Sequence, residues 1–179
     1  MKLSKALLFV LIPLSLSGCG YSFNGYSFDG ASIDYNLTKT LSVVNYINDS
    51  GGGPPNMGQT FTEGLKDYFQ RRTKLELVQN KGDLQFDGVI TNYTVRPQAI
   101  SSSGNNNQAD GTGLMRLTIG VQVNFTNTKK EEDNFQRVFS WYEDYDPEVE
   151  TLNSVEGELV EAIFEQIYFD IFQASVAQW

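Results

Sequence analysis

The sequence has no histidine and only one cysteine among its 179 residues. Histidine is the commonest general base and metal ligand in proteins, and one cysteine alone cannot form a disulfide within the chain. Cations are also scarce, because 13 lysines and arginines stand against 22 acidic residues and leave a net charge of −9. A protein that binds nucleic acid presents a basic surface to the phosphate backbone. These absences argue against an enzyme, a metal protein and a nucleic-acid-binding protein.

No apolar run at the start of the chain is long enough for a transmembrane helix, which needs roughly 20 residues. Two lysines precede the apolar residues 6–16, an arrangement typical of a secretory signal. The run ends in Leu16-Ser17-Gly18-Cys19, which has the pattern of a bacterial lipobox. We therefore expect a signal peptide over residues 1–18 and a covalent lipid, such as palmitate, on Cys19. The alternative is an ordinary signal peptide that happens to be followed by a cysteine.

The rest of the chain is expected to form a lead segment and one domain. Residues 19–38 contain a short duplication, in which the pattern of 20–24 is repeated at 25–29, and their glycines and serines favour an extended conformation. Residues 39–179 are expected to form a single domain. A content of 40% apolar and 13% aromatic residues is sufficient for a core without disulfides.

Hydrophobic patterns in the domain alternate between those of strands and those of helices. The segment 115–126 is the clearest strand, since apolar and polar residues alternate along it and indicate one buried and one wet face. Strands are predicted at 40–47, 75–78, 84–96, 115–126 and 135–145, and helices at 56–72 and 153–174. The sequence therefore predicts an α+β domain with the order β-α-β-β-β-β-α.

The last helix has more apolar surface than one face of a sheet can cover. Asn153 is a candidate N-cap, with Glu156 three residues later as its capping partner. An isoleucine stripe runs along the helix, and aromatic residues such as Phe164 and Phe169 lie around the rest of it. One interpretation is that the sheet covers the stripe and the first helix covers the aromatic side. The other is that part of the aromatic surface contacts a protein partner.

Several short motifs in the chain together resemble the LptE family of lipopolysaccharide-assembly lipoproteins, in its Bacteroidetes-type form. They are Cys19-Gly20-Tyr21-Ser22-Phe23, the Pro54-Pro55 loop before residues 60–67, the strand entry at residues 82–88, and the closing helix. The resemblance covers essentially the whole mature chain, and its specificity lies in the order and spacing of the motifs. It implies two helices packed on one face of a mixed four- to five-stranded sheet.

The resemblance also implies a function. Members of this family are non-enzymatic lipoproteins on the periplasmic side of the outer membrane, without a cofactor. They plug the LptD β-barrel, help it to assemble, and assist the insertion of lipopolysaccharide into the outer leaflet. The alternative is a free-standing periplasmic carrier of a lipid or glycan, which would need an apolar pocket between the helices and the sheet.

The lipopolysaccharide-binding residues of better-known relatives do not transfer to this chain. Those relatives use basic residues in the loop between the two central strands and before the last helix, but residues 101–113 and 148–153 contain no lysine or arginine here. The nearest cations are Arg96 and Arg116, which flank the base of the central hairpin. We expect these two arginines to contact lipopolysaccharide, although structural pairing with acidic residues explains them equally well.

Overall fold

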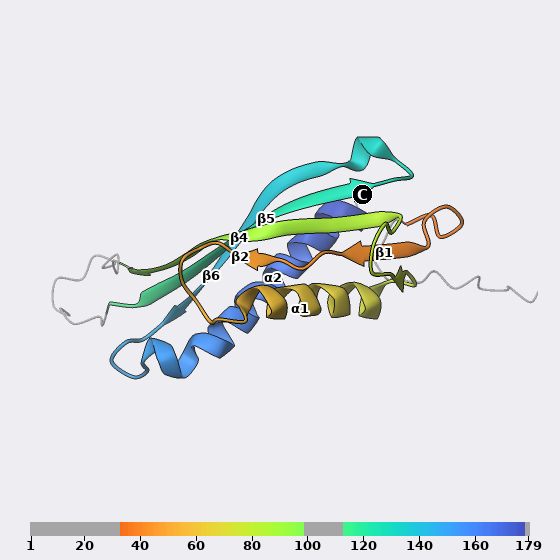
Figure 1. Cartoon of the computed structure of the whole chain (residues 1–179). Helices are drawn as coiled ribbons and strands as arrows, with labels where there is room; N and C mark the ends of the chain where they lie inside the picture. The colour runs from red at the N-terminus through yellow and green to blue at the C-terminus, as the bar shows by residue number, and fades with distance from the viewer. Residues whose placement is uncertain (1–32, 99–112, 178–179) are drawn as a thin grey trace, which may run out of the picture.

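The two helices of the protein lie on the same side of one mixed sheet (Figure 1). The structure is a computed structural model and describes residues 33–98 and 113–177. Helices α1 (Met57–Arg72) and α2 (Leu152–Val176) cover one face of six strands. This arrangement confirms the predicted α+β fold and its layers. Cys19 lies outside the described residues, so its lipidation stays a prediction.

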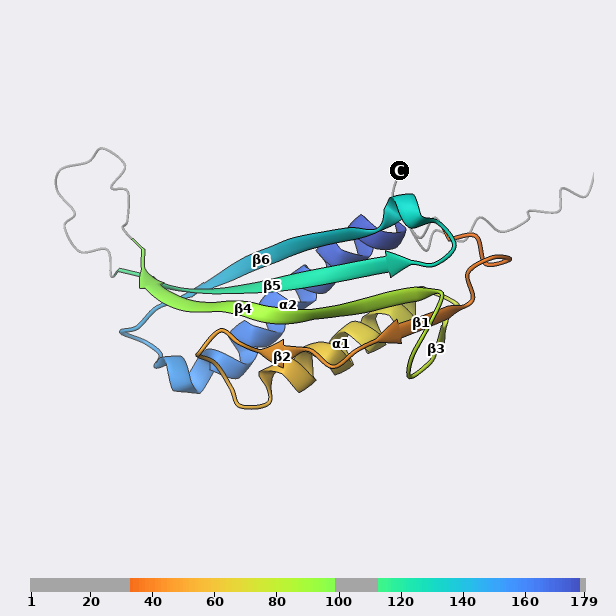
Figure 2. The same cartoon turned by 45° about the horizontal axis from the view of Figure 1, so that its top comes forward.

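The sheet is parallel on one side of β4 and antiparallel on the other. Its strands are β1 (Thr40–Val43), β2 (Ile47–Asn48), β3 (Glu76–Leu77), β4 (Leu84–Pro97), β5 (Met115–Asn127) and β6 (Phe135–Tyr145). Their order is β3-β1-β4-β5-β6, with β2 also paired to β4. The pairs β1–β3, β1–β4 and β2–β4 are parallel, whereas β4, β5 and β6 form an antiparallel meander. The long strands of this meander set the length of the molecule (Figure 2).

The first predicted strand, 40–47, is two strands in the structure, β1 and β2. The backbone N–H of Tyr46, which lies between them, donates to the hydroxyl of Thr62 on α1 at 2.8 Å. The Thr62 hydroxyl in turn donates to the carbonyl of Gly58 at 2.7 Å. A side chain on Gly58 would meet the Tyr46 carbonyl, so glycine permits this close approach. The strand is therefore interrupted between β1 and β2, because the backbone N–H of Tyr46 bonds to a side chain of α1 and not to β4.

The core lies between the sheet and the two helices. Alternate residues of β5 from Leu117 to Phe125 are buried, as the sequence predicts. On β4 the pairing with β5 shifts between Ile90 and Asn92, which indicates a bulge at Thr91. The bulge exchanges the inward and outward positions along β4, so Phe86 and Tyr93 both face the helices although they differ in parity.

The surface of α2 is divided between the sheet and α1, which confirms the first interpretation for most of its length. Phe61 of α1 packs on Phe164 and Tyr168 of α2, with ring centroids 5.0 and 5.1 Å apart. The isoleucine stripe of α2 is fully buried. Phe169 keeps 42% of its surface exposed, so the partner interpretation stays open at that residue.

The predicted N-cap of α2 is wrong. The helix begins at Leu152, with Thr151 rather than Asn153 at the cap position. Glu156 does not complete a capping box, because its carboxylate accepts a hydrogen bond from the hydroxyl of Tyr93 on β4. This contact ties the first turns of α2 to the far part of the sheet. Burial and the bond to Glu156 raise the pKa of Tyr93, so the phenol keeps its proton.

Candidate functional site

The face of the sheet that turns away from the helices is polar along β4 and β5. Side chains alternate between the two faces of a strand. The β5 residues that stand between the buried ones therefore lie on this open face. Its polar residues on the meander are Gln85, Asp87, Asn92, Thr94, Thr118, Gln122, Asn124, Thr126, Gln136 and Ser140. Amides and hydroxyls of this kind form hydrogen bonds with water, sugars or a polar protein surface. The open face therefore suits a wet environment.

The open face has two distinct ends. The described chain enters at the start of β1, whereas the last residues of β4 and the first of β5 lie at the opposite end (Figure 1). β4 has 14 residues, and at about 3.3 Å per residue such a strand is about 45 Å long. Features at the two ends are thus separated by the full length of the sheet.

Arg96 and Arg116, the predicted contacts for lipopolysaccharide, face each other at the hairpin end. They are directly opposite partners in the β4–β5 ladder, and both lie on the open face. The ladder thus brings together the two arginines that flank the base of the hairpin, while their contact with lipopolysaccharide stays a prediction. Their surroundings differ, and this difference decides what each arginine can do.

The guanidinium of Arg116 is held by two neighbours on β6. Its Nε and Nη2 donate to the carboxylate of Asp144 at 2.7 and 2.8 Å, a bidentate geometry. The same guanidinium lies over the ring of Tyr142, 3.6 Å from its centroid. The hydrogen bond raises the pKa of Arg116 and lowers that of Asp144, so the pair is ionised at neutral pH. Arg116 thereby fixes the position of Tyr142.

Arg96 is exposed and free to bind a ligand. Within residues 33–98 and 113–177 its side chain makes no hydrogen bond or ion pair. The charge of Arg116 is balanced by Asp144, so the local excess of positive charge comes from Arg96. A phosphate or carboxylate could bind Arg96, and a sugar ring could pack on the exposed part of Tyr142, which is 43% accessible.

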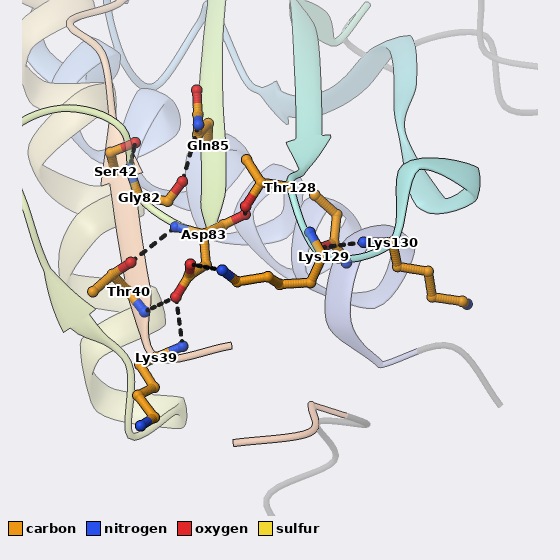
Figure 3. Close-up of polar contacts among 10 residues, drawn as sticks. Lys39, Thr40, Ser42, Gly82, Asp83, Gln85, Thr128, Lys129 and Lys130 are labelled. Atoms are coloured by element: carbon orange, nitrogen blue, oxygen red, sulfur yellow. Dashed lines mark hydrogen bonds and ion pairs between the residues drawn. The ribbon is translucent and has the colours of Figure 1, made fainter. Parts of the chain in front are cut away.

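The opposite end is organised by Asp83, which precedes β4 (Figure 3). One oxygen of its carboxylate accepts the backbone N–H groups of Lys39 and Thr40 at 2.8 and 3.1 Å. The other oxygen pairs with the Lys129 ammonium at 2.8 Å. In return, the backbone N–H of Asp83 donates to the hydroxyl of Thr40, and its carbonyl accepts from Thr128. We call this set of contacts the Asp83 junction.

The Asp83 junction connects the entry of the chain to β4 and to the turn after β5. Hydrogen bonds, first from Lys129 and then from the backbone of Lys39, hold the pKa of Asp83 well below its usual value. Sequence patterns assigned no role to this carboxylate, although Gly82-Asp83 at a strand start is a recognisable turn signal. Its partners come from positions more than 40 residues away in either direction, which no local pattern reveals.

The space between the helices and the sheet, where a lipid carrier would need a pocket, is filled by aromatic side chains. Three phenylalanines are fully buried there: Phe69, Phe86 and Phe125. The ring of Phe86 lies between the other two, with its centroid 4.9 Å from that of Phe69 and 4.8 Å from that of Phe125. A groove of about 580 Å³ does lie between α1 and α2. Its lining carries four carboxylates, those of Glu63, Asp67, Glu161 and Glu165, and one cation, Arg71, so its net charge is negative. Arg71 pairs with Glu165 at 3.8 Å. Such a lining repels an anionic lipid, so the groove does not fit the predicted carrier pocket.

Among the described residues, no group of three acidic, histidine or cysteine side chains is placed to hold a metal ion. Within the same residues, neither helix is both long and apolar enough to cross a bilayer.

Several bacterial lipoproteins are among the solved structures to which this chain is similar. A minor lipoprotein from Acinetobacter baumannii is 18% identical, with a TM-score of 0.49 over 78% of this chain and 94% of its own. Rare lipoprotein B from Shewanella oneidensis is 12% identical, with a TM-score of 0.43 over 76% and 90% of the two chains. Lipoprotein GNA1162 from Neisseria meningitidis is 11% identical, with a TM-score of 0.41 over 72% and 97%. A search of curated proteins finds no match.

A protein-family model described as LptE, lipopolysaccharide-assembly, matches residues 38–175. The match begins at the Asp83 junction, includes both helices and every strand, and ends in the last turn of α2. The family comprises membrane-associated assembly lipoproteins and is not known for enzymes or for cofactor binding. Because the match covers well over half of the sequence, the chain belongs to the LptE lipopolysaccharide-assembly family.

Proposed function

We propose that this protein is anchored to the outer membrane by a lipid on Cys19 and plugs an LptD β-barrel from the periplasmic side. In that position it assists the insertion of lipopolysaccharide into the outer leaflet. The observation that carries the proposal is the family match over residues 38–175. The length and the polarity of the sheet also support it.

The length of the sheet is close to the thickness of a membrane. The hydrocarbon core of a bilayer is about 30 Å thick, and the headgroup regions increase this to about 40–45 Å. The sheet, at about 45 Å, matches the thickness of a bilayer with its headgroup regions. With the entry of the chain at the inner leaflet, Arg96 and Arg116 would lie near the level of the outer leaflet, where lipopolysaccharide is delivered.

The polarity of the open face matches that of a barrel interior. The interior of a large outer-membrane barrel is polar and wet. The open face of the sheet carries amides and hydroxyls over most of its length. A lumen therefore suits this face better than a lipid environment does, and it allows the domain to contact the barrel wall through hydrogen bonds and bridging water.

At the hairpin end, Arg96 would bind an anionic group of lipopolysaccharide, and Arg116 would hold Tyr142 against a sugar. The test is the affinity of the purified full chain for lipopolysaccharide vesicles. Replacing Arg96 with alanine should weaken binding about tenfold, because a charge-assisted hydrogen bond is worth about 1.5–3 kcal/mol before solvent screening. The matched control is Lys74→Ala, which removes an exposed cation at the other end of the sheet.

Lys74→Ala should leave binding unchanged. Equal weakening by both variants would show that only overall charge matters, and would contradict a site at Arg96. The measurement does not depend on the barrel, so the lipopolysaccharide contact and the plug can fail separately.

A further inference from the structure

Strand β6 presents an unprotected edge. It has 11 residues and pairs only with β5, leaving its other side without a strand in the described sheet. Proteins usually protect such edges with proline, with charged side chains, above all lysine, or with a bulge. Three residues of β6 are charged, Arg137, Glu143 and Asp144. β6 contains neither proline nor lysine, and its ladder to β5 runs from Phe135 to Tyr145 without a register shift. An edge of this length and regularity is suited to pairing with another strand.

Apolar side chains gather along this edge. Val138, Trp141 and Tyr142 of β6 are 57%, 38% and 43% exposed, and Phe169 of the neighbouring α2 is 42% exposed. A hollow of about 440 Å³ opens beside Phe169 and Arg137. A partner strand on β6 would cover these side chains together with the free backbone groups of the edge.

The sequence of β6 is complementary to itself when two copies run antiparallel with Ser140 at the centre. In that register the facing pairs among residues 137–143 are Arg137 with Glu143, Val138 with Tyr142, Phe139 with Trp141, and Ser140 with its own counterpart. Opposite charges, and aromatic with apolar side chains, are the favourable cross-strand pairs. By symmetry each of the three unlike pairs occurs twice in the dimer.

Neighbouring registers lose this complementarity. Moving the centre to Trp141 places Val138 opposite Asp144 and Phe139 opposite Glu143. Moving it to Phe139 places Phe135 opposite Glu143. In both cases a carboxylate faces an apolar side chain, so the register centred on Ser140 is preferred.

Arg137 and Glu143 are both available for such a pair. Arg137 lies over the rings of Phe135 and Phe139, 5.9 and 5.6 Å from their centroids, and has no ion pair among the described residues. The side chain of Glu143 forms neither a hydrogen bond nor an ion pair within those residues. The two side chains lie on the helix side of the sheet, as Phe139 does.

We propose that the free protein pairs through β6 with a second copy of itself, antiparallel and with the two-fold axis at Ser140. The two sheets become one continuous sheet, and the exposed Phe169 of each copy is covered. This inference goes beyond the plug function and does not rest on it. A barrel that encloses the domain would compete with the second copy for β6, so the dimer is the form of the protein outside the barrel.

The test uses the full chain with Cys19→Ser, which removes the only natural thiol. Directly opposite residues of antiparallel strands have Cα atoms about 4.5–5.5 Å apart, within the range that a disulfide can bridge. Ser140→Cys should therefore form a disulfide-linked dimer under mild oxidation. Val138→Cys and Tyr142→Cys should not do so alone, but the two variants mixed together should.

Charge reversal provides a second readout by sedimentation equilibrium. Arg137→Glu should raise the dimer dissociation constant about tenfold, because two favourable pairs become two repulsive ones. Glu143→Arg should do the same, and the double variant should restore the affinity. A protein that stays monomeric at its highest soluble concentration overturns the proposal. Disulfide dimers that form equally well with Val138→Cys or Tyr142→Cys alone also overturn it. The proposal fails as well if Ser140→Cys forms a disulfide only with a barrel protein, or if the double charge variant does not regain the dimer affinity of the natural protein.

Discussion

Removing the carboxylate of Asp83 should loosen the end of the sheet where the chain enters. In Asp83→Ala two backbone N–H groups, those of Lys39 and Thr40, lose a charged acceptor, and Lys129 loses its ion pair. Hydrogen bonds to charged groups contribute about 1.5–3 kcal/mol each when buried. Lys129 is 42% exposed, and water can replace part of what is lost, so we expect a decrease of about 2–3 kcal/mol in the free energy of unfolding.

Asp83→Asn keeps an oxygen for the two backbone donors and removes only the charge. It should cost about 1–2 kcal/mol at pH 7. Because the pKa of Asp83 is lowered in the folded state, the stabilisation by its charge is present above the unfolded pKa of about 3.9 and is lost as the pH falls below it. The difference between the natural protein and Asp83→Asn should therefore shrink by about 1 kcal/mol between pH 6 and pH 3.

Urea unfolding followed by far-UV circular dichroism measures these values. The matched control is Glu132→Gln, since Glu132 is 76% exposed and makes only a 3.5 Å ion pair with Lys130. It should cost less than about 0.5 kcal/mol. If Asp83→Ala lowers the free energy of unfolding no more than Glu132→Gln does, the Asp83 junction has no structural role. A stability difference between the natural protein and the Asp83→Asn variant that does not change with pH would refute the role of the charge.

Two further predictions concern packing. Phe61→Ala should lower the free energy of unfolding, measured in urea, by about 3–5 kcal/mol, because Phe61 of α1 is fully buried against α2. Phe169→Ala should lower it by less than about 1 kcal/mol, because Phe169 is half-exposed. Equal losses of stability would contradict the described core. Gly88→Ala should cost about 3 kcal/mol because a Cβ there would meet the carbonyl oxygen of Gln122 on β5. Gly120→Ala, whose Cβ would meet only side-chain atoms, is its control, and an equally large cost there would contradict the close backbone approach at Gly88.

Regular patterns in the sequence predicted most of the fold. The alternation along 115–126 predicted β5 almost to its ends, and the amphipathic run 56–72 predicted α1. The interruption between β1 and β2 was missed because it depends on Tyr46 bonding to Thr62, a contact between separate elements. Propensity describes each residue in its own segment, so it cannot reveal a backbone group that bonds elsewhere.

The site was predicted less completely than the fold. The strand register brings Arg96 and Arg116 together as expected, because both flank one hairpin. The sequence could not distinguish their roles, since the partner of Arg116 is Asp144, 28 residues away on β6. Asp83 was overlooked for the same reason. Side chains that join three separate segments become visible only once the segments are placed in space.

We propose that this LptE-family protein functions inside an outer-membrane barrel. The most direct measurement is affinity purification of the tagged full chain from detergent-solubilised outer membrane, with identification of the proteins that come with it and their stoichiometry. The account predicts one large β-barrel protein in a one-to-one complex that survives high salt, because an enclosed plug is held by more than surface charge. Recovery of the chain without any barrel protein would contradict the claim.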